Sequence, residues 1–175
     1  MGISHLAVHR RPGRAHQGLL RAGLLTLPVA IGRTGIWPHK HEGDGRSPAG
    51  TWRILRLLYR PDKGPRPRTR LPCFPLRPHD GWCDASRHRL YNQPVRLPFP
   101  ASHEKMWRDD ALYDLVLVLD QNSHPAVPGR GSAVFIHLAR PGFAATEGCV
   151  ALRRKDMLRL LARLAPGARI TLQPG

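Results

Sequence analysis

A histidine and a cysteine late in the chain have the types and spacing that nucleophilic catalysis needs. In the segment FIHLARPGFAATEGCVAL, residues 135–152, an apolar run leads to His137, and a Gly148-Cys149 step follows about a dozen residues later. Cysteine attacks as the thiolate, and a nearby imidazole can take the thiol proton. Gly148 permits a tight turn that would place the sulfur among backbone N–H groups. The same spacing also fits a strand, a loop and a second strand with an inert buried thiol.

The segments around this pair predict a mostly β domain. The apolar run 133–136 predicts a buried strand that would hold His137 rigidly. Residues 112–119 are apolar on both faces apart from Asp114, which is typical of a central strand, and 132–138 is expected beside it. Shorter apolar or alternating segments predict the remaining strands, over 6–10, as a pair within 18–31, over 51–59 and over 168–172.

One packing helix is expected after the cysteine, over residues 155–164. Its apolar positions at helical spacing are Met157, Leu158, Leu161 and Leu164. Pro166-Gly167 is expected to end this helix. The predicted fold class is therefore mostly β, with one helix after the Gly-Cys step and long loops.

The longest segment without a period runs from residue 60 to about residue 105 and is rich in proline and arginine. A loop of this length in a small domain is usually functional. One interpretation is a flap that contributes Trp82, Tyr91 and Phe99 to a substrate cleft. The other is an ordered surface segment whose aromatic side chains form a minor core.

Two segments resemble the L,D-transpeptidase family, whose catalytic domain is of the YkuD type. That family has a histidine on a strand, a loop, and then Ser/Thr-x-Gly-Cys followed by an apolar residue; here the last five positions are residues 146–150, TEGCV. The segment EGDGRSPAGTWRI, residues 42–54, is similar to the family's Thr-Pro-x-Gly turn, with Ser47 in place of the threonine. The resemblance runs from about Gly18 to Leu172. It implies that residues 1–17 are an N-terminal extension with the first strand and that 18–175 form a single L,D-transpeptidase-like catalytic domain.

The resemblance implies a role for each residue at the site. Cys149 is the expected nucleophile and His137 the general base and acid, with the imidazole oriented by a backbone carbonyl just after it. The N–H groups of Gly148 and Cys149 are expected to hold the oxyanion. Thr146 and Glu147 are expected to contact substrate, and three arginines are candidates for binding a substrate carboxylate: Arg130, Arg140 and Arg153.

The chain departs from the family pattern at three positions. Glu147 stands where the family often has histidine, Ala151 where it often has arginine or asparagine, and Leu138 where it often has glycine. Glu147 has several open roles: it could receive a substrate amine, contact Arg140 or Arg130, or face solvent. These departures concern substrate contacts and the choice of acyl acceptor rather than the nucleophile and base.

The net charge of +16 comes from 28 basic residues, of which only four are lysines. Such a charge attracts polyanions or substrates rich in carboxylates, although an arginine-rich surface composition explains it equally well. The arginines are spread from Arg10 to Arg169, and aromatic residues make up only 6% of the chain. We therefore expect no specific nucleic-acid partner.

No segment reaches the roughly 18 apolar residues that span a bilayer, so no membrane span is expected. The stretch 22–32 is the longest uncharged apolar run, and residues 10–32 could act as a secretory signal, which would give a periplasmic protein. The Gly-rich exit at 32–35 favours a β-hairpin instead. A cytoplasmic location is the expectation that follows.

The remaining cysteines and histidines give no clear metal site. Cys73 and Cys83 could pair, but free thiols are expected in a reducing compartment, and neither has the C-x-x-C spacing of zinc sites. His39 and His41 have acidic residues nearby, but they lie in a Gly-rich turn that fixes imidazoles poorly. Neither a metal nor another cofactor is therefore expected.

These observations leave three hypotheses about function. The first is a cysteine L,D-transpeptidase, for which the resemblance implies tetrapeptide stems of peptidoglycan, or muropeptides, as substrates and a thioester acyl-enzyme. Its variant is a cytoplasmic L,D-carboxypeptidase of muropeptide recycling, in which water is the acceptor. The second is a non-enzymatic arginine-rich module that binds polyanions, and the third is a metallopeptidase using His39 and His41. The sequence leaves the oligomeric state open.

Overall fold

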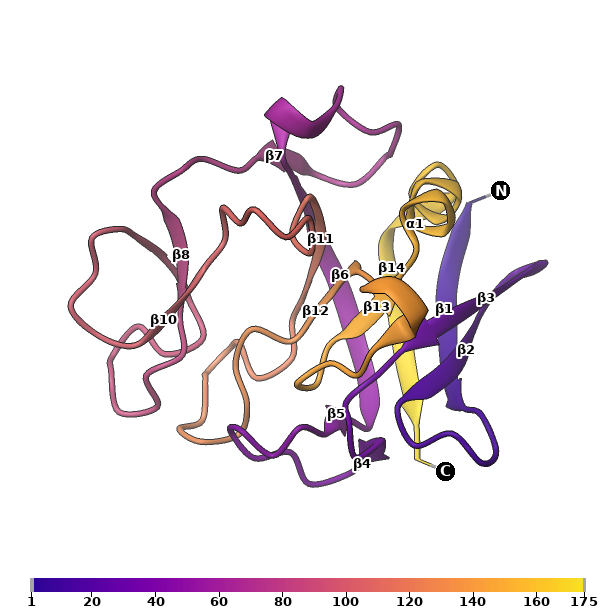
Figure 1. The fold of residues 1–175 in the computed structure, drawn as a ribbon, viewed down its shortest axis with the longest axis horizontal. Helices are drawn as coiled ribbons and strands as arrows, with labels where there is room; N and C mark the ends of the chain where they lie inside the picture. The colour runs from indigo at the N-terminus through magenta and orange to yellow at the C-terminus, as the bar shows by residue number, and fades with distance from the viewer. Residues whose placement is uncertain (1, 175) are drawn as a thin grey trace.

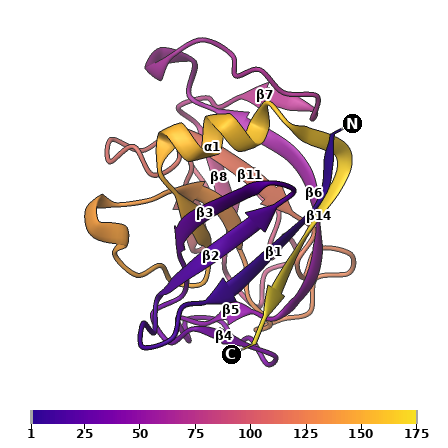
Figure 2. The ribbon, with the colours of Figure 1, turned by 90° about the vertical axis from the view of Figure 1, so that its right-hand side faces the viewer.

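The computed structural model describes residues 2–174, which form fourteen β-strands, one α-helix and two short 3₁₀ segments (Figure 1). The main sheet has nine strands. In spatial order they are β11 (Leu115–Leu119), β12 (Phe135–Leu138), β13 (Val150–Leu152), β3 (Leu25–Ala30), β2 (Gln17–Ala22), β1 (Ile3–Arg10), β14 (Leu164–Gln173), β6 (Gly50–Tyr59) and β7 (Cys73–Pro75). Because β11 also pairs with β6, the sheet closes on itself, and Figure 2 shows the strands curving around a common interior.

Smaller elements lie outside this closed sheet. A three-stranded sheet consists of β8 (Asp80–Cys83), β9 (Pro94–Arg96) and β10 (His103–Lys105), and it lies to the left of the main sheet in Figure 1. The short strands β4 (Ile36–Trp37) and β5 (Ser47–Pro48) pair in parallel below it. The two 3₁₀ segments, η1 and η2, are Pro61–Lys63 and Pro141–Phe143.

Strands β12 and β13 are covered on both faces because the molecule has two apolar clusters. Successive side chains of a strand point to opposite faces. Ile136 and Val150 therefore belong to the main core inside the closed sheet, whereas Phe135 and Cys149 belong to a second cluster between that sheet and the three-stranded sheet. Cover on both faces explains why β12 reads as a continuous apolar run interrupted only by His137.

Helix α1 (Arg154–Leu161) covers one end of the main core (Figure 2). Met157, Leu160 and Leu161 are fully buried, which is the spacing of one helical face. The prediction of a packing helix after the cysteine is confirmed, but two details are wrong. The helix ends at Leu161, so Leu164, Pro166 and Gly167 belong to β14, and Leu158 is exposed rather than part of the apolar face.

The fold class predicted from the sequence, mostly β with one packing helix, is confirmed, as are the hairpin within 18–31 and the strand over 51–59. The prediction of a structureless segment over 60–105 is wrong, because it contains β7 to β10. Trp82 and Tyr91 are buried, and Phe99 packs edge-on against His88, so the interpretation as a minor core describes them.

Two further expectations from the sequence concern the cysteines and a membrane span. Cys73 and Cys83 are free thiols. Residues 2–174 contain no helix with the length and apolar character needed to cross a membrane.

Candidate active site

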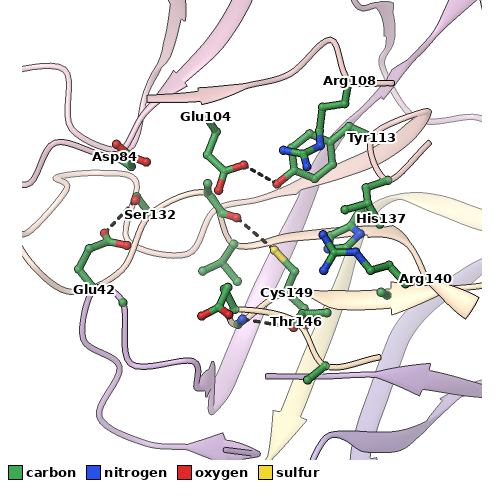
Figure 3. A pocket seen from close by; sticks show the side chains of 18 of the residues that line it. Glu42, Asp84, Glu104, Arg108, Tyr113, Ser132, His137, Arg140, Thr146 and Cys149 are labelled. Carbon is green, nitrogen blue, oxygen red and sulfur yellow. Dashed lines mark hydrogen bonds between the residues drawn. The ribbon is translucent and has the colours of Figure 1, made fainter. Parts of the chain in front are cut away.

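His137 and Cys149 line the same cavity, of about 310 Å³, where β12 and β13 lie side by side (Figure 3). The two strands pair in parallel with His137 opposite Ala151, two residues beyond Cys149. Residues two apart share a face of a strand, so the imidazole and the sulfur both point away from the main core and into the cavity. The pairing of β12 with β13 thus brings His137 and Cys149 to the same cavity, as expected from the sequence.

The Cys149 thiol is held by the backbone of the neighbouring strand. The N–H of Phe135 donates to Sγ at 3.3 Å, and Sγ lies 3.2 Å from the carbonyl oxygen of Ala133, to which the thiol donates. Cys149 is 9% exposed, and burial raises the pKa of its thiol to about 12. The thiol is consequently protonated at neutral pH in the unliganded site.

The His137 imidazole is fixed in one orientation. Its Nδ1 lies 2.8 Å from the carbonyl oxygen of Leu138, which can only accept, so Nδ1 carries the proton and Nε2 is left as the basic nitrogen. This is the backbone carbonyl just after the base that the family resemblance implies. The ring of Tyr113 packs edge-on against the imidazole with centroids 5.5 Å apart. Burial lowers the pKa of His137 to about 4, so the imidazole is neutral at physiological pH.

The Gly-Cys turn is held together by Thr146. Its hydroxyl accepts from the Gly148 N–H at 3.2 Å and donates to the carbonyl oxygen of Cys149 at 2.7 Å. Gly148 has a φ of 140°, a region that side chains disfavour. The Gly148 N–H expected to hold an oxyanion is thus already bonded, and Thr146 shapes the turn in addition to lining the cavity.

A second segment, on the far side of the turn, holds Gly148 in place. The fully buried Ser47 of β5 accepts from the Gly32 N–H at 2.9 Å and donates to the Gly148 carbonyl oxygen at 2.8 Å. A Cβ at Gly32 would lie 2.4 Å from the carbonyl oxygen of Gly45, so the backbones approach too closely for any other residue. The hydroxyl of Ser47 therefore links the segment 42–54 to the turn around Cys149 by a hydrogen bond.

Sequence reasoning missed Lys40, a buried cation beside the nucleophile. Lys40 is only 6% exposed, and its Nζ donates to Asp44 at 2.6 Å and to the carbonyl oxygen of Glu147 at 3.4 Å. Its positive charge acts to lower the pKa of the Cys149 thiol, against the larger effect of burial. The available signal was a lysine four residues before an aspartate in a Gly-rich turn, which the adjacent histidines obscured.

The cavity is divided by charge, with Cys149 between the two parts (Figure 3). Arg108 and Arg140 lie on the side of His137. The opposite side carries three carboxylates, which are Glu42, Asp84 and Glu104. Asp84 and Glu104 were not expected at the site, because both come from the 60–105 segment, in which apolar residues show no regular spacing.

These side chains are held in defined positions. Glu42 accepts from the hydroxyls of Tyr91 and Ser132, and Glu104 accepts from the Tyr113 hydroxyl at 2.7 Å. Burial raises the pKa of Glu104. Oδ1 of Asp84 is buried without a hydrogen-bond partner in the described part of the chain.

The other predicted substrate contacts divide into two groups. Arg140 and Glu147 line the cavity, but Glu147 is largely exposed and pairs with Arg33 rather than with Arg140 or Arg130. Neither Arg130 nor Arg153 lines the cavity, so the structure does not bring these two expected contacts to it.

The physical reason is where their backbones place them. Arg130 lies in the exposed turn before residue 131, where its carbonyl oxygen accepts from Gln121. Arg153 precedes α1, pairs with Asp156 at 3.1 Å and stacks on Phe143 at 5.3 Å. The distance of Arg130 or Arg153 from Cys149 along the sequence does not reveal where these side chains lie.

We predict that Ser47→Ala destabilises the protein by about 1–3 kcal/mol, because it leaves a buried N–H and a buried C=O without their partner. It should also change the rate at which iodoacetamide alkylates Cys149, since the Gly148 backbone loses its anchor. Thermal unfolding and mass spectrometry of the alkylated protein measure the two effects. Ser123→Ala is the matched control, because that half-buried hydroxyl makes a single bond, to the carbonyl oxygen of Asp120, and does not line the cavity. Equal effects of the two substitutions would contradict the role of Ser47.

Comparison with known proteins agrees with this geometry. A family model described as the L,D-transpeptidase catalytic domain, YkuD, matches residues 16–172. No curated protein and no solved structure gives a significant match. The matched range covers nearly the whole chain, including both motifs and every strand that carries a residue of the cavity. The chain therefore belongs to the YkuD family of L,D-transpeptidase catalytic domains.

Proposed function

We propose that this protein is a cysteine acyltransferase that acts on peptidoglycan stem peptides through a Cys149 thioester. The observation that carries the proposal is the placement of Cys149 and His137 in one cavity, with Nδ1 of the imidazole bound to a backbone carbonyl. That arrangement leaves Nε2 as a base on the cavity side, which is what a neutral thiol needs to become a nucleophile.

Acylation then follows from the protonation states at rest. Nε2 of His137 takes the proton of the Cys149 thiol as the sulfur attacks the carbonyl carbon of the scissile peptide bond. The C–S bond forms, the carbonyl oxygen becomes an oxyanion, and His137 becomes an imidazolium. When the tetrahedral intermediate collapses, the C–N bond breaks and the imidazolium gives its proton to the departing amine. The thioester and a free amino acid are the products.

Backbone groups of the turn are proposed to hold the oxyanion. We assign this role to the Cys149 N–H, joined by the Gly148 N–H once it exchanges the Thr146 hydroxyl for the substrate oxygen. Fixed donors in a site that excludes water stabilise such a charge strongly.

Deacylation reverses the proton transfers with a new acceptor. An amine of a second stem, or water, gives a proton to Nε2 of His137 and attacks the thioester carbonyl. The C–S bond breaks, and the sulfur regains the proton. An amine acceptor yields a crosslink, whereas water yields the shortened peptide of an L,D-carboxypeptidase.

The division of charge in the cavity suits a peptide with both an anionic and a cationic group. For a tetrapeptide stem cut between a diamino acid and a terminal D-alanine, a carboxylate of the donor would lie toward Arg108 and Arg140. The ammonium of the diamino acid would lie toward Glu42, Asp84 and Glu104. Opposite charges around a desolvated pocket orient a substrate more than they tighten its binding.

The first prediction tests the nucleophile and the base. Cys149→Ala should abolish thioester formation and turnover of a tetrapeptide stem, and His137→Ala should lower the acylation rate by about 10²–10⁴-fold because the proton acceptor is gone. Mass spectrometry of the intact protein after incubation with the tetrapeptide detects the acyl-enzyme directly. Cys83→Ala, a buried thiol that does not line the cavity, is the control. Acylation that persists in Cys149→Ala would disprove the assignment.

The second prediction concerns pH. Because burial lowers the pKa of His137 to about 4, the basic imidazole should persist well below pH 6.5, and kcat/KM should fall only as the pH approaches about 4. The depressed pKa also means that the unfolded chain binds more protons than the folded one below pH 6.5, so stability falls with the pH in this window. Circular dichroism at each pH separates unfolding from loss of the base. An acidic limb near pH 6.5 would show an imidazole exposed to water.

The third prediction concerns the fate of the thioester. Glu147 lies at the cavity beside Cys149 and pairs with Arg33. We expect Glu147→Gln to change the ratio of hydrolysed tripeptide to crosslinked dimer more than the rate of donor consumption, because it alters charge where the acceptor enters. Chromatography of both products gives the ratio, and Arg33→Gln tests the other half of the ion pair. The same ratio in all three proteins would mean that Glu147 merely faces solvent.

A further inference from the structure

A groove continues from the catalytic cavity toward the segment that follows β6. A second cavity shares Leu112 and Arg140 with the catalytic one. A third, between α1 and residues 59–68, shares Lys63, Asp114 and Arg154 with the second. Figures 1 and 2 both show this segment beside α1. The three cavities therefore lie next to one another in a path along the surface.

The outer part of this path, which we call the basic groove, carries an excess of positive charge. Its two acids are already neutralised, since Asp110 pairs with Arg108 at 2.7 Å and Asp114 with Arg154 at 3.1 Å. The cations that line it are Arg60, Lys63, Arg66, Arg68, Arg140 and Arg154. Within residues 2–174, none of Lys63, Arg66 and Arg68 has a carboxylate at ion-pair distance.

The backbone that carries these unpaired cations is held in place by hydrogen bonds and packing. Arg154 donates to the Lys63 carbonyl oxygen at 3.1 Å, and Arg60 is buried between Asp62 and the ring of Trp107. Prolines at 65 and 67 fix φ on either side of Arg66. The side chains of Arg66 and Arg68 remain exposed at the rim of the groove. Arg66 contacts the Cys73 thiol, but neither it nor Arg68 is neutralised by a carboxylate, so this surface can bind an anion.

We propose that the basic groove binds an anionic group of the same donor molecule whose peptide bond reaches Cys149. The proposal rests on the proposed function and extends it to a second part of the substrate. The ligand chemistry is a carboxylate or a phosphate, both of which match the forked guanidinium of arginine. The position of the groove beside the catalytic cavity, with Arg140 lining both, is what favours the donor over an unrelated polyanion.

The test uses tetrapeptide donors with identical scissile ends and different caps on the amino terminus. An acetyl cap is neutral, a succinyl cap carries a carboxylate, and a phosphorylated hydroxyacyl cap carries a phosphate. We expect KM to be about fivefold lower for the anionic caps at low salt, from two or three exposed ion pairs, with the difference shrinking at high salt. The better of the two anionic caps identifies the group.

Matched variants locate the effect. Arg66→Gln combined with Arg68→Gln should remove the difference between caps while leaving kcat for the acetylated donor unchanged. Arg21→Gln combined with Arg169→Gln removes the same charge from exposed positions on β2 and β14 that line none of the three cavities, and it should preserve the difference. No preference for anionic caps in the natural sequence, or equal losses in both double variants, would overturn the proposal.

Binding to the Cys149→Ala protein separates this proposal from the reaction itself. Titration calorimetry with the acetyl and succinyl peptides reports the groove even if no donor is turned over. An absence of turnover together with preferential binding of the anionic peptide would reject the proposed reaction and retain the groove. Loss of affinity for a single-stranded oligonucleotide in the groove variant, with no change in cap preference, would assign the groove to another polyanion and overturn the proposal.

Discussion

The parallel pairing of β12 with β13 is the constraint on which the site depends. Parallel neighbours cannot be joined by a tight turn, so the chain must cross from the end of one strand to the start of the other. His137 lies on β12, and Cys149 immediately precedes β13, so the crossover is the loop that separates the two residues in the sequence. The spacing of about a dozen residues is therefore the length of a connection. Because both strands are buried on both faces, their register cannot slip without exposing the main core.

Burial has a cost for this chemistry and also a use. The apolar surroundings disfavour both the thiolate and the imidazolium, so the pair rests in its neutral form. We propose that charge develops only when a substrate carbonyl arrives, and the positive charge of Lys40 then favours the thiolate. A neutral thiol also reacts more slowly with oxidants than a thiolate does, since the thiolate is the reactive species. The site thus holds both the thiol and the imidazole uncharged at rest in one cavity.

The sequence was informative where local pattern and function coincide. The apolar run 133–136 predicted β12, the Gly-Cys step predicted the turn, and the spacing of Met157 and Leu161 predicted the buried face of α1. Boundaries were less certain, because the chain leaves α1 at Leu161 and Pro166-Gly167 continue in a strand whose pairing with β1 outweighs local preference. The assignment of Cys149 and His137 to catalysis came from motif and resemblance together.

The remainder of the site was hidden because it depends on long-range packing. Asp84 and Glu104 reach the cavity from the three-stranded sheet, whose short strands pair only with one another and show no periodic pattern of apolar residues. Lys40 is buried only because Asp44 and the turn at Glu147 enclose it. Choosing among two dozen arginines required knowing which backbone faces the cavity, and that information is absent from charge or composition.

Ser47 has a consequence for how this active site could be moved or redesigned. The Gly148 turn is held by a hydrogen bond from Ser47, which lies 101 positions earlier in the chain. A loop transplanted from 139–150 into another scaffold would carry Cys149 without the serine that bonds to the backbone of its turn. The unit that could be transferred is therefore two discontinuous segments, 32–48 and 137–150. A change in the backbone of one segment requires a matching change in the backbone of the other.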